Sequence, residues 1–584
     1  MNNVLESVKQ LLEWLPAGSP LVFSGIADLP PYFKTILELY TLFVRGLFPI
    51  LAFIILLSCM LLLWPDRKED EVRGYLLLKD GSRMPLKYWE NSIGRSKASD
   101  LEIAFAYVSR SHAVLTFRDK SWHLTDVGSK GGVEVNGAKV EKTESLDYGD
   151  TISFAGIEAV LVPAEKPVHN HRDLTSAPPE SKVNPGMIFA LILLFQVLGA
   201  VQSCIAAGAV LNLAVPVTFL VFILAECLFF FSVQRWSQRS FDLELLLCFL
   251  SGLSLFIVAS AHPDLLYKQL AAIFLGVAVY TIIGIMIYDP ERARKLKYVF
   301  VAAAIVLLAL NLALGKTYFG AKRWIDLGFI TIQPSEFVKI AFVMAGTATL
   351  DRLLTTRNMT AFILFSGACI GALVFIRDFG TVAVFFGAFI VIAFMRSGDL
   401  RTIALASAGA AIGALAVISF IPYVATRFAA WGKVWEYADT TGYQQARTMI
   451  AAASGGLLGV GAGNGYLAKI AAADTDLVFG IICEEWGFLV AITTVLVFIF
   501  LAVYAVSLAK GCRSSLYAIA ACGAASMLLF QTALNVLGPV DIFPLTGITM
   551  PFVSRGGSSM ISAWGLLAFI KTAADRFGSE RNGE

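Results

Sequence analysis

The sequence predicts a polytopic α-helical membrane protein with an all-β domain inserted near its N-terminus. Of its 584 residues, 57% are apolar and 15% are charged, and the mean hydropathy is +0.70. Soluble domains carry about 25% charged residues, so this chain does not have the composition of a water-soluble protein. The net charge of +2 gives no basis for nucleic-acid binding. The eight cysteines lie in or beside apolar runs, which indicates small buried side chains and no disulfide framework.

Long apolar runs define the membrane-spanning part of the chain. A run of about 20 residues crosses a hydrocarbon core of ~30 Å as a helix. We therefore expect about 13 spans, at residues 40–64, 187–210, 214–233, 244–260, 269–288, 298–314, 336–350, 361–376, 381–395, 403–421, 477–508, 517–537 and 558–570. The first is one transmembrane helix after an N-terminal segment, residues 1–39, and residues 187–233 hold two additional helices before the last ten.

Basic residues in the short loops predict the orientation of these spans, because cytoplasmic loops are enriched in Lys and Arg. They fall in alternate loops, at Arg235 and Arg239, residues 292–297, Arg352 and Arg357, Arg396 and Arg401, Lys510 and Arg513, and after the last span. The N-terminus is then expected outside, and the inserted domain and the C-terminus inside. Of the outer loops, residues 315–334, 422–476 and 538–557 are long, polar and rich in glycine, so we expect external chemistry there.

Residues 72–163 differ in composition from the rest and predict a cytoplasmic all-β sandwich. Alternating stretches such as Ala113–Phe117 and Thr151–Phe154 are typical of strands, and Gly and Asn turns separate them. The domain resembles the forkhead-associated (FHA) family through five spaced motifs: Ile93-Gly94-Arg95, Val108-Ser109-Arg110-Ser111-His112, Trp122–Ser129, Val135-Asn136-Gly137 and Leu146–Asp150. A proline-rich stretch, residues 164–186, is expected to follow it as an extended linker.

The resemblance to FHA domains implies that a phosphothreonine-containing protein binds here. A phosphate needs a guanidinium with hydroxyl and amide donors, and the matching residues are Arg95, Ser109, Arg110 and Ser129. The residue matching His112 braces the loop in that family. After the serine the family usually has x-Asn-Gly, whereas this chain has Lys130-Gly131-Gly132. A sandwich that has kept its fold without its ligand is therefore the alternative.

The membrane part, residues 241–577, resembles the SEDS family (shape, elongation, division, sporulation), which contains the cell-wall glycosyltransferases of the RodA, FtsW and SpoVE type. Five segments in family order carry the resemblance: Gly320–Leu327 with Gln333–Lys339, Arg377–Thr381, Gly442–Gly461, Thr475–Gly487, and Asn535 with Phe543–Ser559. The resemblance implies a core of ten helices. The chain departs from the family pattern at three positions, where it has Arg377, Arg447 and Arg555.

The resemblance places the substrate-binding residues in these segments: Lys322, Arg323, Trp324, Glu336, Lys339, Arg377, Asp378, Arg447, Ser554 and Arg555. Glu336 and Lys339 are spaced i, i+3 and share a helix face, so they are either a functional site or a structural ion pair. Arg377 either binds an anionic headgroup or pairs with Asp378, and the pairing is our default. Ser554 and Arg555 form either a diphosphate cradle or part of a plain glycine-rich turn.

Asp476 is the expected catalytic residue. The resemblance places the essential carboxylate on the Asp of Thr475-Asp476, at the external end of a span. A carboxylate there can act as the general base that removes a proton from a sugar hydroxyl. Asp474, two residues earlier, is a competitor that spacing alone does not exclude. Capping of the following helix by Asp476 is compatible with catalysis.

The resemblance further implies that the enzyme polymerises lipid II, a disaccharide carried on undecaprenyl diphosphate, at the outer face of the bacterial cytoplasmic (inner) membrane. It implies a class B penicillin-binding protein as partner. The basic residues could offset charge on the diphosphate leaving group. A divalent cation, Mg²⁺ or Mn²⁺, is left open as a cofactor, and the sequence shows no metal-ligand cluster. A lipid II flippase and a non-catalytic scaffold remain alternatives, and the sequence does not choose between elongation, division and sporulation.

Overall fold

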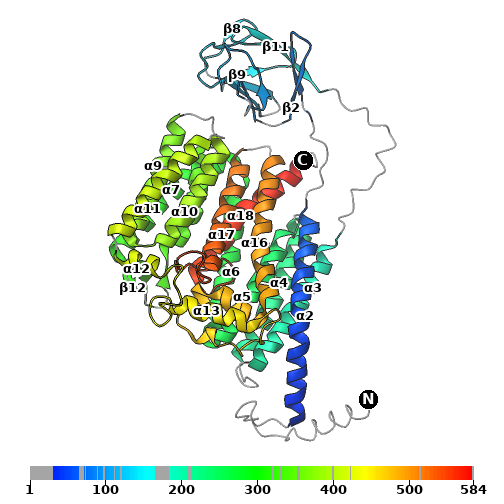
Figure 1. The fold of residues 1–584 in the computed structure, drawn as a ribbon. Helices are drawn as coiled ribbons and strands as arrows, with labels where there is room; N and C mark the ends of the chain where they lie inside the picture. The colour runs from blue at the N-terminus through cyan, green and yellow to red at the C-terminus, as the bar shows by residue number, and fades with distance from the viewer. Residues whose placement is uncertain are drawn as a thin grey trace.

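The computed structural model describes residues 31–581, apart from gaps at 65–71, 73, 88–89, 97–98, 111, 119–120, 142, 165–182, 207–212, 238–239, 319–320, 329–330, 351–355, 398–399, 421 and 512–514. Most of the predicted N-terminal segment, residues 1–39, and of the predicted linker, residues 164–186, lies outside the described residues. Two parts are visible in Figure 1, a helical bundle and a β domain, and the β domain is inserted between the first two helices of the bundle.

The bundle confirms the predicted multi-pass membrane architecture. It consists of α2 (Pro31–Leu63), α3 (Pro185–Ala206), α4 (Ala214–Ser232), α5 (Leu243–Ala261), α6 (Leu266–Tyr288), α7 (Pro290–Leu314), α8 (Pro334–Leu350), α9 (Thr356–Ile376), α10 (Phe379–Ser397), α11 (Leu400–Phe420), α16 (Phe488–Gly511), α17 (Ser515–Leu537) and α18 (Gly557–Arg581). In the described part of the chain, 10 helices are long and apolar enough to cross a membrane. The predicted runs 336–350, 381–395 and 558–570 also form helices (α8, α10 and α18), but these are shorter or less apolar.

One predicted span, residues 477–508, is wrong as a single helix. The spanning helix α16 begins only at Phe488, and the residues before it form α14 (Ala473–Asp476), α15 (Val478–Ile481) and a π-helical turn, Ile482–Trp486. The break lies at Gly487, which has a φ of 93° that side chains other than glycine rarely adopt. A Cβ at Gly487 would lie 2.4 Å from the carbonyl oxygen of Leu457, so another segment of backbone approaches here.

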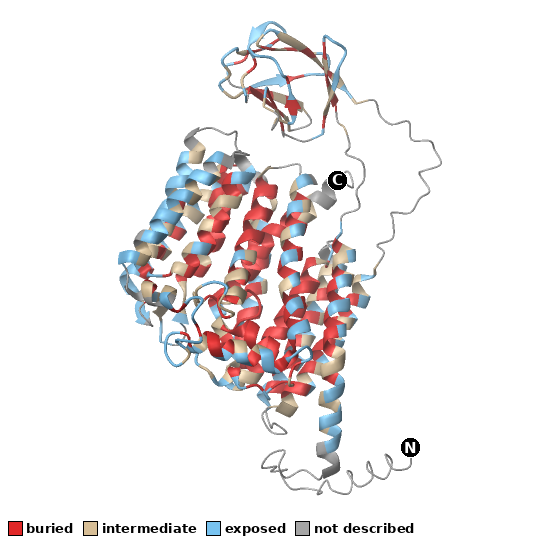
Figure 2. Ribbon diagram, viewed as in Figure 1, coloured by how far each residue is buried: buried red, intermediate tan, exposed pale blue. Residues whose placement is uncertain are grey.

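The centre of the bundle is tightly packed. Figure 2 shows buried residues running through the middle helices, whereas α11 is mostly exposed. Helix α18 packs along α6, and α16 packs along α17. Helix α3 lies against α5 at a glycine contact: a Cβ at Gly199 would lie 2.1 Å from the ring of Phe256.

Most of the irregular structure lies at the end of the bundle opposite to the β domain (Figure 1). It contains a small antiparallel sheet of β12 (Lys316–Tyr318), β13 (Ala321–Asp326) and β14 (Thr331–Ile332), together with α12 (Pro422–Ala430) and α13 (Tyr443–Gly455). We call these elements, with residues 456–486 and 538–556, the loop face. The loop face combines three of the loops that the sequence predicts as long and rich in glycine.

The β domain is a sandwich of two sheets, as predicted. Its strands are β1 (Gly74–Leu78), β2 (Arg83–Leu86), β3 (Glu90–Gly94), β4 (Leu101–Glu102), β5 (Ala113–Arg118), β6 (Ser121–Asp126), β7 (Val133–Val135), β8 (Ala138–Lys139), β9 (Thr143–Leu146), β10 (Thr151–Phe154) and β11 (Ile157–Pro163). The sheet orders are β2-β1-β11-β10-β7-β8 and β4-β3-β5-β6-β9. Apolar residues of alternating positions, among them Leu115, Trp122 and Phe154, fill the space between the sheets.

The contact between α3 and α5 gives a test of the bundle packing. We expect Gly199→Ala to destabilise the protein by about 1–3 kcal/mol, because the added methyl group collides with Phe256. Gly284→Ala in α6 is the matched control, because nothing lies within 4 Å of its Cβ position. Thermal unfolding of the purified protein measures both changes. Equal unfolding temperatures of the two variants would contradict the proposed close contact.

Candidate functional site

Asp476 lies on the loop face beside two residues that come from distant parts of the sequence. It ends the short helix α14 and is half-buried. A Cβ at Gly547 would lie 3.0 Å from Oδ2 of Asp476 and 3.6 Å from Nη1 of Arg323. The structure therefore brings together one carboxylate, one guanidinium and a glycine with a φ of 65°, a position where a side chain would crowd the carboxylate.

Hydrogen bonds from two buried side chains fix the backbone around Asp476. Nδ2 of Asn535 donates to the carbonyl oxygens of Ile548 at 2.6 Å and of Asp476 at 3.2 Å. Oγ of Ser554 donates to the carbonyl oxygen of Thr475 at 2.7 Å. Ser554 is 2% exposed, so in this structure it supports the site from behind.

Asp474 has a very different environment from Asp476. Its carboxylate is 2% exposed and accepts hydrogen bonds from Nε and Nη2 of Arg555, the latter at 3.2 Å. Nε2 of His262 lies 3.8 Å from the same carboxylate. The backbone N–H of Arg555 also donates to the carbonyl oxygen of Asp474 at 2.8 Å. Asp474 and Arg555 thus balance each other's charge and tie two loops together, which favours a structural role for both.

Arg323 holds the loop that faces Asp476. Its Nη1 donates to the carbonyl oxygen of Gly547 at 3.0 Å, and its Nε lies 3.4 Å from Oδ1 of Asp378. Asp378 is 1% exposed and also accepts a hydrogen bond from Oγ1 of Thr381 at 2.9 Å. The expected default pairing of Arg377 with Asp378 is therefore not what the structure shows. Arg377 has a φ of 66° and an exposed side chain, while Arg323 takes its place beside Asp378.

The other expected basic residues lie on the surface of the loop face. Lys322 is exposed and Trp324 is half-buried on strand β13. Because side chains alternate along a strand, both point to the face opposite to Arg323. Arg447 is exposed on α13, with its guanidinium carbon 5.2 Å from the centre of the Tyr443 ring. The structure does not bring Lys322 and Trp324 to the same side as Arg323.

Glu336 and Lys339 lie in a buried polar network inside the bundle. Nζ of Lys339 donates to Oε1 of Glu336 at 2.8 Å and to Oε1 of Gln531 at 2.7 Å. Oγ of Ser562 donates to the other oxygen of Glu336 at 2.7 Å. The network joins α8, α17 and α18, and the two charged side chains are 1% and 5% exposed. This geometry favours the structural alternative that the sequence leaves open.

The Thr475–Gly487 segment contains two further acidic residues, Glu484 and Glu485, and both are buried and hydrogen-bonded. Both oxygens of Glu484 accept backbone hydrogen bonds, from the N–H groups of Tyr466 and Leu467, each at 2.9 Å. Oγ of Ser260 donates to Oε1 of Glu485 at 2.5 Å. Burial is the largest cause that raises the pKa of Glu485 to about 7. The sequence signal that could have identified these two residues is a pair of adjacent carboxylates in an otherwise apolar run.

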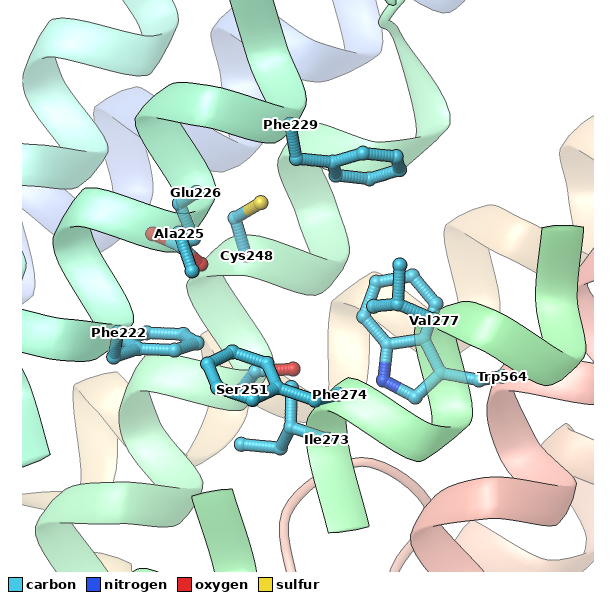
Figure 3. Close-up of a pocket in the computed structure, with 10 residues that line it drawn as sticks. All are labelled: Phe222, Ala225, Glu226, Phe229, Cys248, Ser251, Ile273, Phe274, Val277 and Trp564. Atoms are coloured by element: carbon cyan, nitrogen blue, oxygen red, sulfur yellow. The ribbon is translucent and has the colours of Figure 1, made fainter. Parts of the chain in front are cut away.

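The described residues also line two cavities. One, of about 200 Å³, lies on the loop face between Ser260, His262 and residues 463–472. The other, of about 110 Å³, lies between α4, α5, α6 and α18, and Glu226 and Trp564 both line it (Figure 3). None of the residues that line the second cavity belongs to the loop face, so it is separate from the Asp476 site. Among the described residues, no three His, Cys, Asp or Glu side chains group as a metal site.

The expected phosphopeptide-binding residues lie on neighbouring loops at one edge of the β domain. Nδ1 of His112 accepts from the N–H of Ser109 at 3.0 Å, and its Nε2 lies 3.0 Å from the carbonyl oxygen of Gly132. Oγ of Ser109 accepts from the N–H of Lys130 at 3.0 Å. The backbone of Arg95 donates to Ser109, and the side chains of Arg95 and Arg110 are exposed. Oγ of Ser129 donates to Asp126 at 3.1 Å.

Packing explains why position 131 carries a glycine where the FHA pattern has an asparagine. A Cβ at Gly131 would lie 2.3 Å from Cβ of Ala155. Ala155 lies in the turn between β10 and β11 with a φ of 52°, a conformation in which glycine is more favourable. The two positions are therefore coupled, because an asparagine at 131 needs a smaller residue at 155.

This coupling predicts the effect of restoring the asparagine. We expect Gly131→Asn to destabilise the β domain by about 1–3 kcal/mol through the collision with Ala155. Adding Ala155→Gly removes the methyl group and suits the turn, so the double variant should regain stability. Hydrogen exchange of β7 and β10 in the full chain measures this. If Gly131→Asn alone exchanges like the wild type, the steric explanation is wrong.

The raised pKa of Glu485 predicts a pH dependence of stability. Between its ordinary pKa of 4.5 and its folded pKa of about 7, the folded protein keeps a proton that the unfolded chain has released. Stability should therefore fall as the pH rises through this window and level off above it. At about 1.4 kcal/mol per pKa unit, the total change is about 3 kcal/mol. Glu485→Gln should lose this part of the profile in unfolding measurements between pH 5 and 8; parallel profiles would contradict it.

Comparisons with known proteins agree with the fold. The family model for the FtsW/RodA/SpoVE cell cycle proteins matches residues 241–576, and the FHA domain model matches residues 91–155. The chain is similar to the peptidoglycan glycosyltransferase RodA of Mycobacterium tuberculosis, with 28% identity over 53% of this chain and 70% of that protein. It is similar to the probable peptidoglycan glycosyltransferase FtsW of Tolumonas auensis, with 32% identity over 54% of this chain and 86% of that protein.

A third relative is the stage V sporulation protein E of Bacillus subtilis, with 30% identity over 50% of this chain and 84% of that protein. Among solved structures, a peptidoglycan synthase complex that coordinates polymerization and crosslinking is similar, with 26% identity and a TM-score of 0.51. That match covers 58% of this chain and 99% of the solved chain. The chain therefore belongs to the FtsW/RodA/SpoVE family of cell cycle proteins and carries, in addition, an FHA domain between its first two described helices.

Proposed function

We propose that this protein is a peptidoglycan glycosyltransferase that polymerises lipid II, with Asp476 as its general base. The observation that carries the proposal is the contrast between two neighbouring carboxylates. Asp474 is buried and paired with Arg555, whereas Asp476 is half-buried and lies beside Gly547 and Arg323. A general base must reach the hydroxyl from which it removes a proton, and the greater exposure of Asp476 supports it over Asp474.

The reaction needs one proton transfer and one displacement. Asp476 accepts the proton of the 4-hydroxyl of the acceptor N-acetylglucosamine as that oxygen attacks the anomeric carbon of the donor N-acetylmuramic acid. The bond from this carbon to the diphosphate breaks, and undecaprenyl diphosphate leaves with the bonding electrons. Positive charge near the leaving group lowers the barrier. Lys322 and Arg447 are exposed on the loop face, and Arg377 is exposed between α9 and α10. These three are the candidates to supply it.

The orientation follows from the placement of charges along the chain. The loop face lies on the outer side of the bacterial cytoplasmic membrane, where the lipid-linked disaccharide is used. The β domain and the C-terminus lie in the cytoplasm, in agreement with the basic residues of the loops at that end, such as Arg292, Arg294 and Lys510.

The β domain adds a second function on the cytoplasmic side, the recognition of a phosphothreonine-containing protein. Arg95 and Arg110 are exposed beside Ser109, whose hydroxyl is held by the backbone of Lys130. Two guanidinium groups beside a fixed hydroxyl suit a phosphate dianion. A class B penicillin-binding protein is the proposed partner for crosslinking, since a similar solved complex coordinates polymerization and crosslinking.

The deciding measurement compares wild type, Asp476→Asn and Asp474→Asn on fluorescent lipid II, with and without a penicillin-binding partner. We expect Asp476→Asn to fold like the wild type and to lose at least ~100-fold in polymerisation rate, since it removes the base. Asp474→Asn should lower the unfolding temperature, because it leaves Arg555 without its ion pair, and should keep part of the activity.

Two outcomes would overturn the proposal. Full polymerisation by Asp476→Asn would remove Asp476 from the chemistry. No polymer from folded wild type that binds lipid II, under any partner condition, would favour a flippase or a scaffold. Lipid II translocation into the outer leaflet of vesicles would then separate these two.

A further inference from the structure

Four aromatic rings from four different elements pack together beneath the loop face. Phe48 of α2 stacks on Trp486 with ring centres 4.8 Å apart and an interplanar angle of 19°. Phe195 of α3 lies 4.2 Å from Phe48, and Phe256 of α5 lies 5.1 Å from Trp486. All four side chains are 3% exposed or less. Trp486 is the last residue of the π-helical turn that follows the Asp476 segment.

A second contact joins α2 and α3 to the same region. Nε2 of Gln202 in α3 donates to Oγ1 of Thr41 in α2 at 3.2 Å. A Cβ at Gly461 would lie 3.0 Å from Cγ2 of Thr41, and a Cβ at Gly463 would lie 2.6 Å from Cβ of Ala206. The glycine-rich backbone of residues 459–465 therefore lies directly on both helices.

A series of hydrogen bonds, most of them between backbone groups, connects these contacts to Asp476. The N–H groups of Val460 and Gly461 donate to the carbonyl oxygens of Glu484 at 2.8 Å and Glu485 at 3.0 Å. The Glu484 carboxylate holds the N–H groups at residues 466 and 467. Three turn hydrogen bonds then lead to Asp476. The N–H of Ile470 donates to the carbonyl oxygen of Leu467 at 2.9 Å, that of Ala473 to Ile470 at 3.1 Å, and that of Asp476 to Ala472 at 2.9 Å.

Helices α2 and α3 lie outside residues 241–576, the part that matches the family. We propose that they nevertheless position the loop that carries Asp476, and that Phe48 and Trp486 are the positioning residues. The inference rests on the proposed function, because it concerns the same carboxylate. It makes the two helices that flank the FHA domain part of the machinery that sets the geometry of the external site.

The physical reason is that the loop contains only short helical turns, Leu467–Lys469 and α14, and no long helix or strand to hold it. Its position is set by the surfaces on which it lies, and coupling between distant parts of a protein runs through such packed contacts. Removal of the Phe48 ring leaves a space beside Trp486 into which the turn can move. Displacement of a catalytic group by about 1 Å can cost up to ~100-fold in rate. Lys322, an exposed candidate for substrate binding, lies on β13 and outside the four packed rings, so we expect its contribution to KM to change little.

The test uses the full-length protein with Phe48→Ala and Phe230→Ala. Phe230 in α4 is the matched control, because it forms a stacked pair with Phe189 of α3 at 4.3 Å and is not one of the four rings around Trp486. We expect Phe48→Ala to lower kcat for lipid II polymerisation by about tenfold or more with little change in KM. Phe230→Ala should lower the unfolding temperature to a similar extent and keep kcat. Phe48→Leu, which restores most of the volume, should recover part of kcat.

A second measurement does not depend on activity. Hydrogen exchange of residues 457–476 should increase in Phe48→Ala and stay at the wild-type level in Phe230→Ala. Unchanged exchange there, or kcat losses that match in the two variants, would overturn the positioning role. If wild type and Phe230→Ala make no polymer while the exchange difference appears, the proposed function fails and the positioning of the loop stands.

Discussion

The loop face depends on the close approach of two backbone segments, residues 455–465 and 483–487. A Cβ placed on Gly455 would lie 2.0 Å from the carbonyl oxygen of Cys483. A Cβ on Gly459 would lie 2.3 Å from the carbonyl oxygen of Glu485, and a Cβ on Gly487 would lie 2.4 Å from that of Leu457. At the end of a membrane bundle, irregular backbone is stable only where the protein itself satisfies its polar groups. Glycines permit this approach, and the N–H groups of Val460 and Gly461 donate to the carbonyl oxygens of Glu484 and Glu485.

The separation of the two aspartates follows from this arrangement. The turn that brings residues 473–476 under the loop buries Asp474 against Arg555 and leaves Asp476 at the edge, facing Gly547 and Arg323. Arg323 in turn is fixed by Asp378. Two charge pairs, Asp474 with Arg555 and Arg323 with Asp378, therefore lie near the carboxylate proposed for catalysis. Buried pairs of this kind tolerate little change, because removal of one partner leaves an uncompensated charge.

The FHA domain and the bundle are joined by the helices on which the loop face lies. Helix α2 leads into the β domain and α3 leads out of it, and both contact residues that precede or follow Asp476 in the loop. The FHA domain is therefore connected to the loop face by two helices of the bundle. In the β domain itself, the close contact between Gly131 and Ala155 explains why position 131 carries no side chain.

The sequence by itself determined the spanning helices, the all-β insertion and the motifs, because apolar length, alternation and residue spacing are local properties of the chain. It also placed Asp476, Arg323 and Asp378 among the candidate residues through a family resemblance. Only the tertiary structure decided which partners these residues have: Arg323 with Asp378, Asp474 with Arg555, and Glu336 with Lys339 and Gln531 inside the bundle. In the tertiary structure the predicted helix over residues 477–508 is interrupted at Gly487, and Phe48 stacks on Trp486. Those contacts link residues far apart in the chain, so no local pattern encodes them, and they form only when the helices pack.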